Sequence, residues 1–312
     1  MDRCALRSYH YGTVSKSGQI LVLGNLSLDL VERARVSADA VGAALSAGRN
    51  SFVDVSAELS AGGSAFLFAS AAATAADDGA LTIGAVGADP LGQVLVQCLA
   101  SRGLATAALE RVGAATPVIV VTYFEHGPRL LLTPSPTSND ALTPEWALDA
   151  AARSYARHGK PRLLFVSGHA LRRPATTRFD ATLELLKWAR SLGIPVVLDL
   201  VPHRFRASVG PLEEVLANVG PVSGLVAEHE TVVEVGLTNE AASLADAAVA
   251  LRAAAAEFAV VQRKAELGVY EQAVASKGGP AVARYVYDIS SERGLGDRLA
   301  VEALISLGIL SS

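Results

Sequence analysis

The stretch GAVGADPLG, residues 84–92, decides the fold of this chain. It joins an aliphatic run, residues 81–85, which predicts a buried strand, to residues 93–102, which predict a helix that ends at Gly103. Three glycines punctuate the connection, and Asp89 is interpreted as a turn or helix-cap residue that orders it. The stretch therefore predicts a strand–loop–helix unit, the building block of α/β folds.

Similar units follow along the rest of the chain. Buried strands are predicted at residues 163–166, 196–200, 225–227 and 259–262, with helices such as 178–191 between them. Continuous apolar strands that alternate with helices indicate a mostly parallel sheet with helices on both faces. No internal repeat or low-complexity linker interrupts the 312 residues, so a single domain is predicted.

The same pattern begins near the N-terminus. Residues 19–23 predict a first buried strand, and the loop after it, residues 25–29, is expected to face a ligand. Gly62 and Gly63 then open an alanine-rich stretch, residues 64–76, that predicts a buried helix. Strand, loop and helix are again predicted in succession.

A second, smaller structure is predicted outside this alternation. Residues 118–124 and 129–133 are extended runs joined by hairpin residues, and 51–55 is a further extended run. We expect a small lid built from segments near 30–56 and 116–134. Such a lid also offers an apolar face through which two chains could pair as a homodimer.

Composition and charge exclude several classes of function. The net charge of −4 and the absence of a dense Lys/Arg run argue against a nucleic-acid partner. No stretch reaches the roughly 18 apolar residues of a membrane span, and residues 1–17 lack the apolar core of a signal peptide. Cys4 and Cys98 are too few for a disulfide framework, which fits a reducing cytoplasm. A cytoplasmic protein that binds a small molecule is the expectation.

Candidate ligand-binding residues follow the predicted strands, because ligands bind at the carboxyl ends of parallel strands. These residues are Asp29, Gly62, Gly87, His169 and Asp199. His126 and His169 lack metal-ligand partners at short spacing, so no metal cluster is predicted. Asp199 beside His203 has two interpretations, acid–base chemistry or a carboxylate that satisfies loop amides, of which we favour the second.

The segment GLGD, residues 294–297, precedes an apolar stretch, residues 299–310, that predicts a helix. Its glycines let backbone N–H groups converge, and the helix dipole favours an anion there. Asp297 beside such an anion is placed to accept a proton from a hydroxyl that attacks a γ-phosphoryl group. Taken alone, the tetrapeptide is more often a tight turn with a capping aspartate. The chain contains neither a P-loop nor a Gly-x-Gly-x-x-Gly segment after its first strand.

Four segments, taken in order, resemble the ribokinase (PfkB) family of small-molecule kinases. They are residues 24–29, 62–63, 84–92 and 294–297, and residues 139–144 and 193–199 also look like family segments. The resemblance runs over nearly the whole chain. It implies an α/β fold of three layers, with a doubly wound, mostly parallel sheet and a small β lid.

The resemblance also implies roles on the substrate side. Asp29 would bind a substrate hydroxyl, and Asn25 and Asn139 would lie at the substrate as well. Gly62 and Gly63 would pack against it. The lid would close over this region and exclude water, which protects the phosphoryl group from hydrolysis.

On the phosphate side the resemblance implies ATP as donor, with Mg²⁺, and Asp297 as the catalytic base. The anion hole would consist of Gly294, Leu295 and Gly296. Candidates for the nucleotide and magnesium side are Glu228, Glu230, Arg263 and Arg293. No residue is expected to ligate the metal directly.

Several positions depart from the family pattern. The family's asparagine after the double glycine falls on Leu67, which predicts an acceptor with fewer hydroxyls than a simple sugar. The family's Asn-x-x-Glu falls on residues 228–231, and its Asp-Thr before the anion hole falls on 291–293. Residues 262–267 place side chains where backbone would approach ATP, and only a short stretch follows Asp297.

Two functions remain open. The first is an ATP-dependent kinase that phosphorylates a hydroxyl of a sugar-like or nucleoside-like small molecule. The second is a kinase-fold protein that no longer uses ATP and binds or transforms a metabolite in the old acceptor pocket. An open adenine slot beside residues 294–297 favours the first function, and a slot plugged by Lys264 or Leu267 favours the second.

Overall fold

A computed structural model of the protein describes residues 19–48, 50, 53–76, 79–125, 129–172, 176–201, 205–266, 269–286 and 294–311. Some residues named from the sequence lie outside these ranges. They are Cys4, His126, His203, Leu267, Arg293 and its neighbours at 291 and 292. All other candidate site residues are described.

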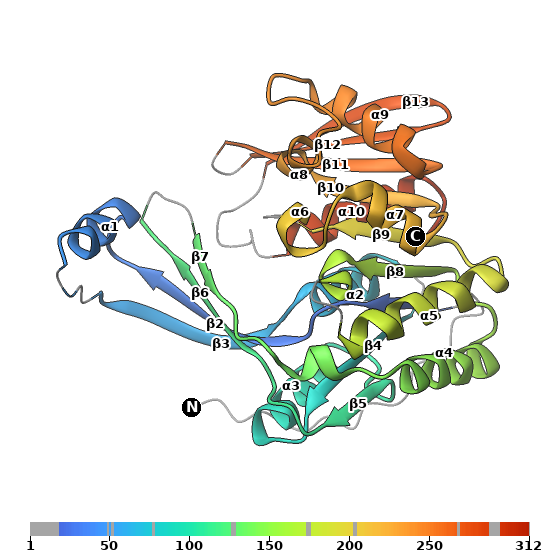
Figure 1. Cartoon of the computed structure of the whole chain (residues 1–312), viewed down its shortest axis with the longest axis horizontal. Helices are drawn as coiled ribbons and strands as arrows, with labels where there is room; N and C mark the ends of the chain where they lie inside the picture. The colour runs from blue at the N-terminus through green and yellow to red at the C-terminus, as the bar shows by residue number, and fades with distance from the viewer. Residues whose placement is uncertain are drawn as a thin grey trace.

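The larger of two β-sheets has the strand order β13-β12-β11-β10-β9-β8-β1-β4-β5 (Figure 1). Its strands are β1 (Ile20–Leu23), β4 (Ala80–Gly87), β5 (Leu109–Val112), β8 (Leu163–Ser167), β9 (Val196–Leu200), β10 (Gly224–Glu228), β11 (Phe258–Glu266), β12 (Val269–Ser276) and β13 (Gly279–Val286). Neighbours from β11 to β5 pair in parallel. Strands β12 and β13 add to one edge in antiparallel orientation. The predicted mostly parallel sheet is confirmed, and its antiparallel edge was not predicted.

Helices cover both faces of this sheet and give the three predicted layers. One face packs against α2 (Ser64–Ala75), α3 (Pro90–Ser101) and α10 (Leu295–Ser306). The other packs against α4 (Pro144–His158), α5 (Thr177–Ser191), α7 (Leu212–Val219) and α9 (Leu244–Ala255). Shorter helical segments are α6 (Phe205–Ser208), α8 (His229–Glu234), η1 (Ser138–Ala141) and η2 (Gly168–Leu171).

Burial explains why these strands form the centre of the molecule. Every residue of β1, β4 and β8 is buried, as continuous apolar strands in a covered parallel sheet require. The ring of Phe68 in α2 stacks on that of Phe165 in β8, with centroids 3.6 Å apart. Helix α2 is therefore fixed against the sheet at its centre.

The smaller sheet has the strand order β3-β2-β6-β7 and projects from the side of the main body (Figure 1). Its strands are β2 (Ser27–Ala34), β3 (Val55–Gly62), β6 (Val118–Tyr123) and β7 (Arg129–Leu132). Strand β2 pairs antiparallel to β3 and parallel to β6. Helix α1 (Ala38–Ser46) lies at the outer end of this sheet.

Two sequence expectations about this region change. Asp29 was expected on a loop, but it lies within β2, where it pairs with Ser60 and Ile119. The physical reason is that β2 finds a strand on each side, so its backbone groups are paired. Of the run expected at residues 51–55, residues 51 and 52 lie outside the described residues, and the described strand runs from Val55 to Gly62.

The described residues include no helix that is both long and apolar enough to cross a membrane.

Candidate functional site

A row of polar side chains continues one apolar face of the large sheet at the carboxyl ends of its strands. Val197, Val226 and Val260 belong to the core beneath α2 and α10. Two residues further along the same strands, and hence on the same face, lie Asp199, Glu228 and Gln262. The ladder extends this polar row sideways, because Ser167 pairs with Asp199 and Gln272 pairs with Gln262. The apolar face thus becomes polar where ligands bind in α/β sheets.

Helices α2 and α10 pack against each other on this face, and each begins at a glycine. Gly294 precedes α10 with φ +69°, and no side chain caps that helix. The first N–H groups of a helix have no partner within the helix, and they carry its positive dipole end. The turn formed by Gly294, Leu295, Gly296 and Asp297 therefore offers donors to an anion.

The glycines of the acceptor side are required by close contacts. A Cβ atom on Gly62 would lie 2.1 Å from Oδ2 of Asp29, so the carboxylate rests directly on the Gly62 backbone. A Cβ atom on Gly63, whose φ is +89°, would lie 2.3 Å from the carbonyl oxygen of Asn25. Only glycine lets the start of α2 come this close to β2 and to the loop after β1.

The first turn of α2 connects the two ends of the site. Asp29 contacts Gly62 just before α2, and Leu67 within its first turn lies 3.2 Å from where a Cβ on Gly294 would be. One helical turn is only about 5.4 Å long. Asp29 and the turn before α10 thus lie at the same edge of the sheet. We call these the acceptor end and the phosphate end.

The loop after β1 is held by buried side chains. The amide group of Asn139 accepts a hydrogen bond from Leu26 N (3.0 Å) and donates one to Leu26 O (2.9 Å). Asn25 N donates to Oγ of Ser64 at the start of α2 (3.1 Å). Both functional groups of the Asn139 side chain are therefore engaged by the loop itself.

Arg178 is the central buried charge of the acceptor end, and sequence analysis missed it. Its guanidinium donates to Oδ1 of Asn25, to the carbonyl oxygen of His169 (2.8 Å) and to Asp140 (3.2 Å). Burial lowers the pKa of Arg178 to about 10, a shift that Asp140 opposes and Arg172 increases, so the side chain stays charged at neutral pH. An arginine on a helix usually extends into solvent, and nothing in the sequence distinguishes this one.

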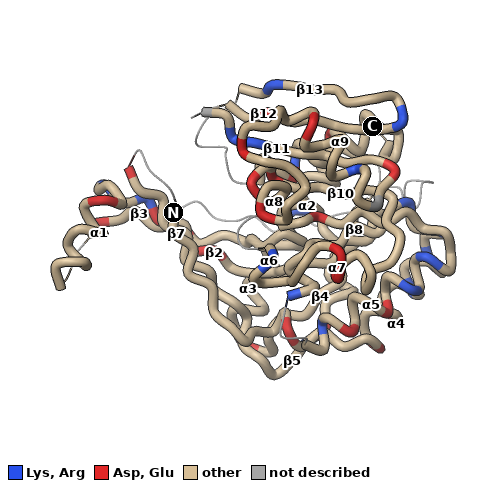
Figure 2. Tube along the Cα trace, turned by 45° about the horizontal axis from the view of Figure 1, so that its top comes forward, with Lys and Arg blue, Asp and Glu red and all other residues tan. Residues whose placement is uncertain are grey.

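Three carboxylates interact at the phosphate end. Burial and the nearby Glu228 together raise the pKa of Asp297 to about 7, against the opposing hydrogen bond from its own amide. Burial, Asp297 and Glu228 also raise the pKa of Asp199. Asp199 was expected to satisfy loop amides; residues 202–204 of the loop after β9 lie outside the described residues, and the charged groups near Asp199 that the structure describes are Asp297 and Glu228. Acidic residues also gather around α8, which follows β10 directly (Figure 2).

The remaining nucleotide-side candidates occupy varied positions. Arg263 forms an ion pair with Glu271 of the neighbouring strand (2.6 Å), and Glu230 is exposed on α8. Lys264 of β11 is exposed as well. Gln262 is buried and donates to the carbonyl oxygen of Gly296 (2.9 Å).

Asp89 has the structural role that the sequence predicted. Its side chain caps α3 by accepting from Gly92 N (2.7 Å), and it also accepts from the backbone N–H (2.8 Å) and hydroxyl (2.9 Å) of Thr116. These bonds hold the pKa of Asp89 below its usual value despite the opposing effect of desolvation. The loop within residues 84–92 is therefore held in place by the side chain of Asp89.

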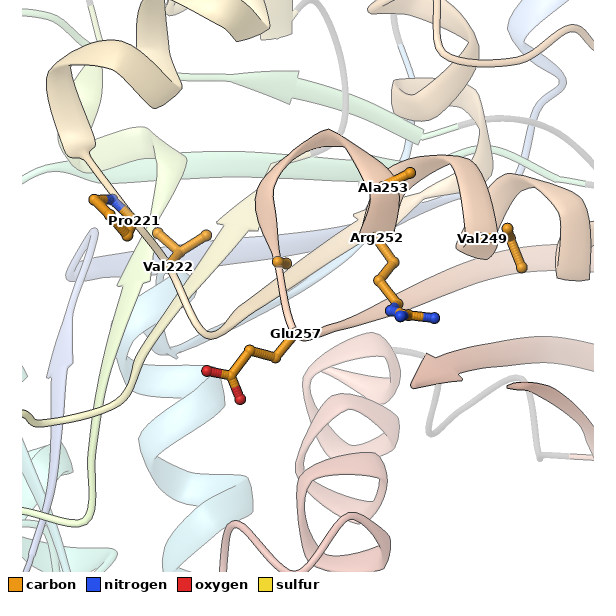
Figure 3. Close-up of a pocket in the computed structure, with 7 residues that line it drawn as sticks. Pro221, Val222, Val249, Arg252, Ala253 and Glu257 are labelled. Carbon is orange, nitrogen blue, oxygen red and sulfur yellow. The ribbon is translucent and has the colours of Figure 1, made fainter. Parts of the chain in front are cut away.

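A cavity of about 580 Å³ lies at the opposite edge of the sheet (Figure 3). Its lining includes Val222, just before β10, and Glu257, just before β11, together with Arg252 of α9. Val222 and Glu257 mark the amino ends of their strands. The cavity is therefore separate from the candidate site.

Solved structures resemble this chain over most of its length. A 2-dehydro-3-deoxygluconokinase from Thermotoga maritima is 20% identical, covers 93% of this chain and 88% of its own, and has a TM-score of 0.70. A PfkB family carbohydrate kinase from Listeria grayi is 15% identical, with coverages of 93% and 87% and a TM-score of 0.69. The chain has the ribokinase-like fold.

A third ribokinase-like structure was solved with a nucleotide. It is an E. coli protein assigned as a ribokinase II, in complex with ATP and Mg²⁺, with 14% identity, coverages of 93% and 87% and a TM-score of 0.66. No protein-family model matches the chain, and no curated protein matches its sequence. The predicted fold is thus confirmed by structure.

Proposed function

We propose that this ribokinase-like protein transfers a phosphoryl group from ATP to a hydroxyl of a sugar-like or nucleoside-like small molecule. The observation that carries the proposal is the uncapped turn 294–297: its Gly294 lies against Leu67 in the first turn of α2, and Gly62, just before α2, contacts Asp29. Phosphoryl transfer needs reactants held in position, stabilisation of the developing negative charge and a proton acceptor. An anion-binding turn with carboxylates beside it can supply these. The kinases named above support the proposal.

Each end of the site has a role in this reaction. Asp29 accepts a hydrogen bond from an acceptor hydroxyl, while the backbone at Gly62 and Gly63 packs against the substrate. Asp297 takes the proton of the attacking hydroxyl. Its pKa of about 7 suits a general base near neutral pH. The N–H groups of Leu295 and Gly296 stabilise the negative charge of the transferring group.

The acidic surroundings fit a cation-bridged phosphate. When ionised, Asp199, Glu228 and Asp297 would repel a bare triphosphate, and a divalent cation would balance the charge. Among the described residues, no three His, Cys, Asp or Glu side chains are grouped to chelate a metal. We therefore propose that Glu228 and Asp199 hold a hydrated Mg²⁺ through water, as this ion prefers. When bound, the ion neutralises phosphate charge.

The small sheet supports a proposal about assembly. Its face opposite to Asp29 carries Leu30 beside Leu59 and Val120, with Glu32 hydrogen-bonded to Thr122 further along. Leu59, Leu130 and Leu132 on this outer face are 50%, 46% and 55% exposed. Such a face on a lid matches a second copy of itself across a twofold axis. We propose a homodimer through this outer face.

One observation favours the alternative function, a kinase fold that no longer uses ATP. Gln262 and Arg263 are engaged in bonds within the protein, to Gly296 and Glu271 respectively. Side chains committed in this way do not contact a nucleotide. Under this alternative the acceptor end still binds a metabolite, because the hydrogen bonds that hold its loop do not involve Gln262 or Arg263.

Calorimetry distinguishes the two functions. Titration of the full-length protein with ATP and MgCl₂ is expected to show binding, and a panel of sugars and nucleosides is expected to yield at least one phosphorylated product. Binding that requires Mg²⁺ supports the proposed charge balance. No heat with ATP and no product across the panel would exclude the kinase. Binding of a panel compound without ATP would then favour the alternative.

A further inference from the structure

Gln262 lies directly beneath the turn that begins α10. Its side chain is 4% exposed, and its Nε2 group donates to the carbonyl oxygen of Gly296 (2.9 Å) and to Oε1 of Gln272 (2.9 Å). The contact is tight, because a Cβ atom on Gly296 would lie 3.0 Å from Oε1 of Gln262. One side chain thus connects β11, β12 and the phosphate end.

Both hydrogens of the Gln262 amide are committed by these two bonds. The bond to Gly296 fixes which way the amide faces, because a backbone carbonyl oxygen accepts only from the nitrogen. Glu228 is the cross-strand neighbour of Gln262, yet no hydrogen of the Gln262 amide is left to donate to it. The amide is therefore directed at Gly296 and not at the acidic row.

A purely structural role explains these bonds poorly. The neighbouring positions on this face are apolar: Val260 is buried in the core, and Val274 is partly buried against it. An apolar side chain at 262 would continue that core, and replacing a bonded polar pair by apolar groups of similar shape is often neutral for stability. The polar pair is found instead where it reaches the first turn of α10.

We propose that Gln262 is a positioning residue for the phosphate-binding turn, an inference that rests on the proposed kinase function. Donation to the carbonyl oxygen of Gly296 holds the peptide between Gly296 and Asp297 in one orientation. A turn fixed before the ligand arrives needs no reorganisation during transfer. Gln272 orients the amide group of Gln262 through their hydrogen bond, so it contributes to the same positioning role.

Three variants of the full-length protein test this role. Gln262→Met keeps the length of the side chain and removes both hydrogen bonds. Gln262→Glu restores a donor only while the introduced carboxyl group is protonated. Val274→Ala is the matched control, because it creates a small cavity on the same face in β12 without touching Gly296.

Hydrogen exchange gives a readout that does not depend on activity. In Gln262→Met, the amides of residues 298–300 are expected to exchange about tenfold faster, while those of 301–306 stay unchanged. In Val274→Ala, any increase is expected to be spread over α10. Unchanged exchange at 298–300 in Gln262→Met overturns the proposal whether or not the protein is a kinase.

Kinetics gives the second readout. Gln262→Met is expected to lower kcat about tenfold at unchanged KM for the acceptor, less than the loss of a direct oxyanion donor. The ratio of kcat between Gln262→Glu and the parent is expected to fall as pH rises, because ionisation removes the donor. A loss of kcat in Val274→Ala equal to that in Gln262→Met, or a ratio independent of pH, would mean that Gln262 only supports the core. A parent without phosphoryl transfer would instead refute the proposed function and leave the exchange result to decide the role of Gln262.

Discussion

The acceptor end and the phosphate end differ in how their polar groups are satisfied. At the acceptor end, Asn139 and Arg178 bond the loop after β1 from within the protein. At the phosphate end, α10 begins without a side-chain cap, and Asp297 has a pKa raised to about 7. Polar groups that already have hydrogen-bond partners hold the acceptor end rigid. Uncapped N–H donors and carboxylates with a raised pKa are instead available to bind a ligand. The acceptor end therefore keeps its structure without a ligand, whereas the phosphate end gains hydrogen-bond partners when a ligand binds.

The largest predicted effect comes from removing the buried cation of the acceptor end. Arg178→Met removes a buried cation and leaves Asp140 and Asn25 without their partner. We expect the free energy of unfolding in urea to fall by about 3 kcal/mol, as for other broken buried pairs. The control is Arg153→Met, whose exposed pair with Asp149 is worth less than about 1 kcal/mol. Equal effects of the two substitutions would refute the idea of a rigid acceptor end.

The next effect separates the two ends by function. Gly62→Ala places a methyl group where Oδ2 of Asp29 now lies, so the carboxylate must move. We expect kcat/KM for the acceptor to fall about 10- to 100-fold, within the range caused by small misplacements of catalytic groups. Binding of ATP with Mg²⁺ by calorimetry should not change. Gly113→Ala is the control, since no atom lies within 4 Å of a Cβ there. A matching loss of ATP binding in Gly62→Ala would show that the ends are not independent.

A smaller effect follows from the raised pKa of Asp297. The folded pKa of about 7 lies above the usual 3.8, so folding favours the protonated form. That stabilisation is fully present below pH 4 and is lost as pH rises through 7, by up to about 1.4 kcal/mol per pH unit. Urea unfolding between pH 4 and 8 measures this fall. We expect a shallower fall in Asp297→Asn, with a residual part from Asp199. Identical profiles for parent and variant would contradict the buried location of Asp297.

The smallest effect concerns assembly. Leu59→Asp places a charge on the exposed outer face of the small sheet. We expect sedimentation to show a shift from dimer to monomer, with the free energy of unfolding changed by less than about 0.5 kcal/mol at dilute concentration. Val282→Asp, on the exposed strand β13, should leave the assembly unchanged. A parent that sediments as a monomer would contradict the proposed homodimer.

The sequence predicted the large sheet well, because its glycine stretch and its buried apolar strands are local signals. It did not predict β12 and β13, whose exposed or mixed positions lack a continuous apolar run. Their pairing with β11 is a tertiary effect.

Candidate residues were predicted by motif, but their partners were not. Asp29 and Asp297 stood out because they follow glycine-rich or strand-end patterns. Arg178 and Gln262 have no such pattern, since an arginine in a helix or a glutamine in a strand is ordinary in sequence. Their importance comes from burial and from bonds to residues more than 30 positions away. Only three-dimensional contacts reveal groups of this kind.

The most direct test of the central claim compares the parent with Asp297→Asn in a single-turnover transfer from ATP to an acceptor found by the panel. We expect a rate about 10²- to 10⁴-fold lower in the variant, since the proton acceptor is gone. Binding of ATP with Mg²⁺ should be kept, because the backbone donors of the turn remain. Transfer at the parental rate in Asp297→Asn would contradict the account.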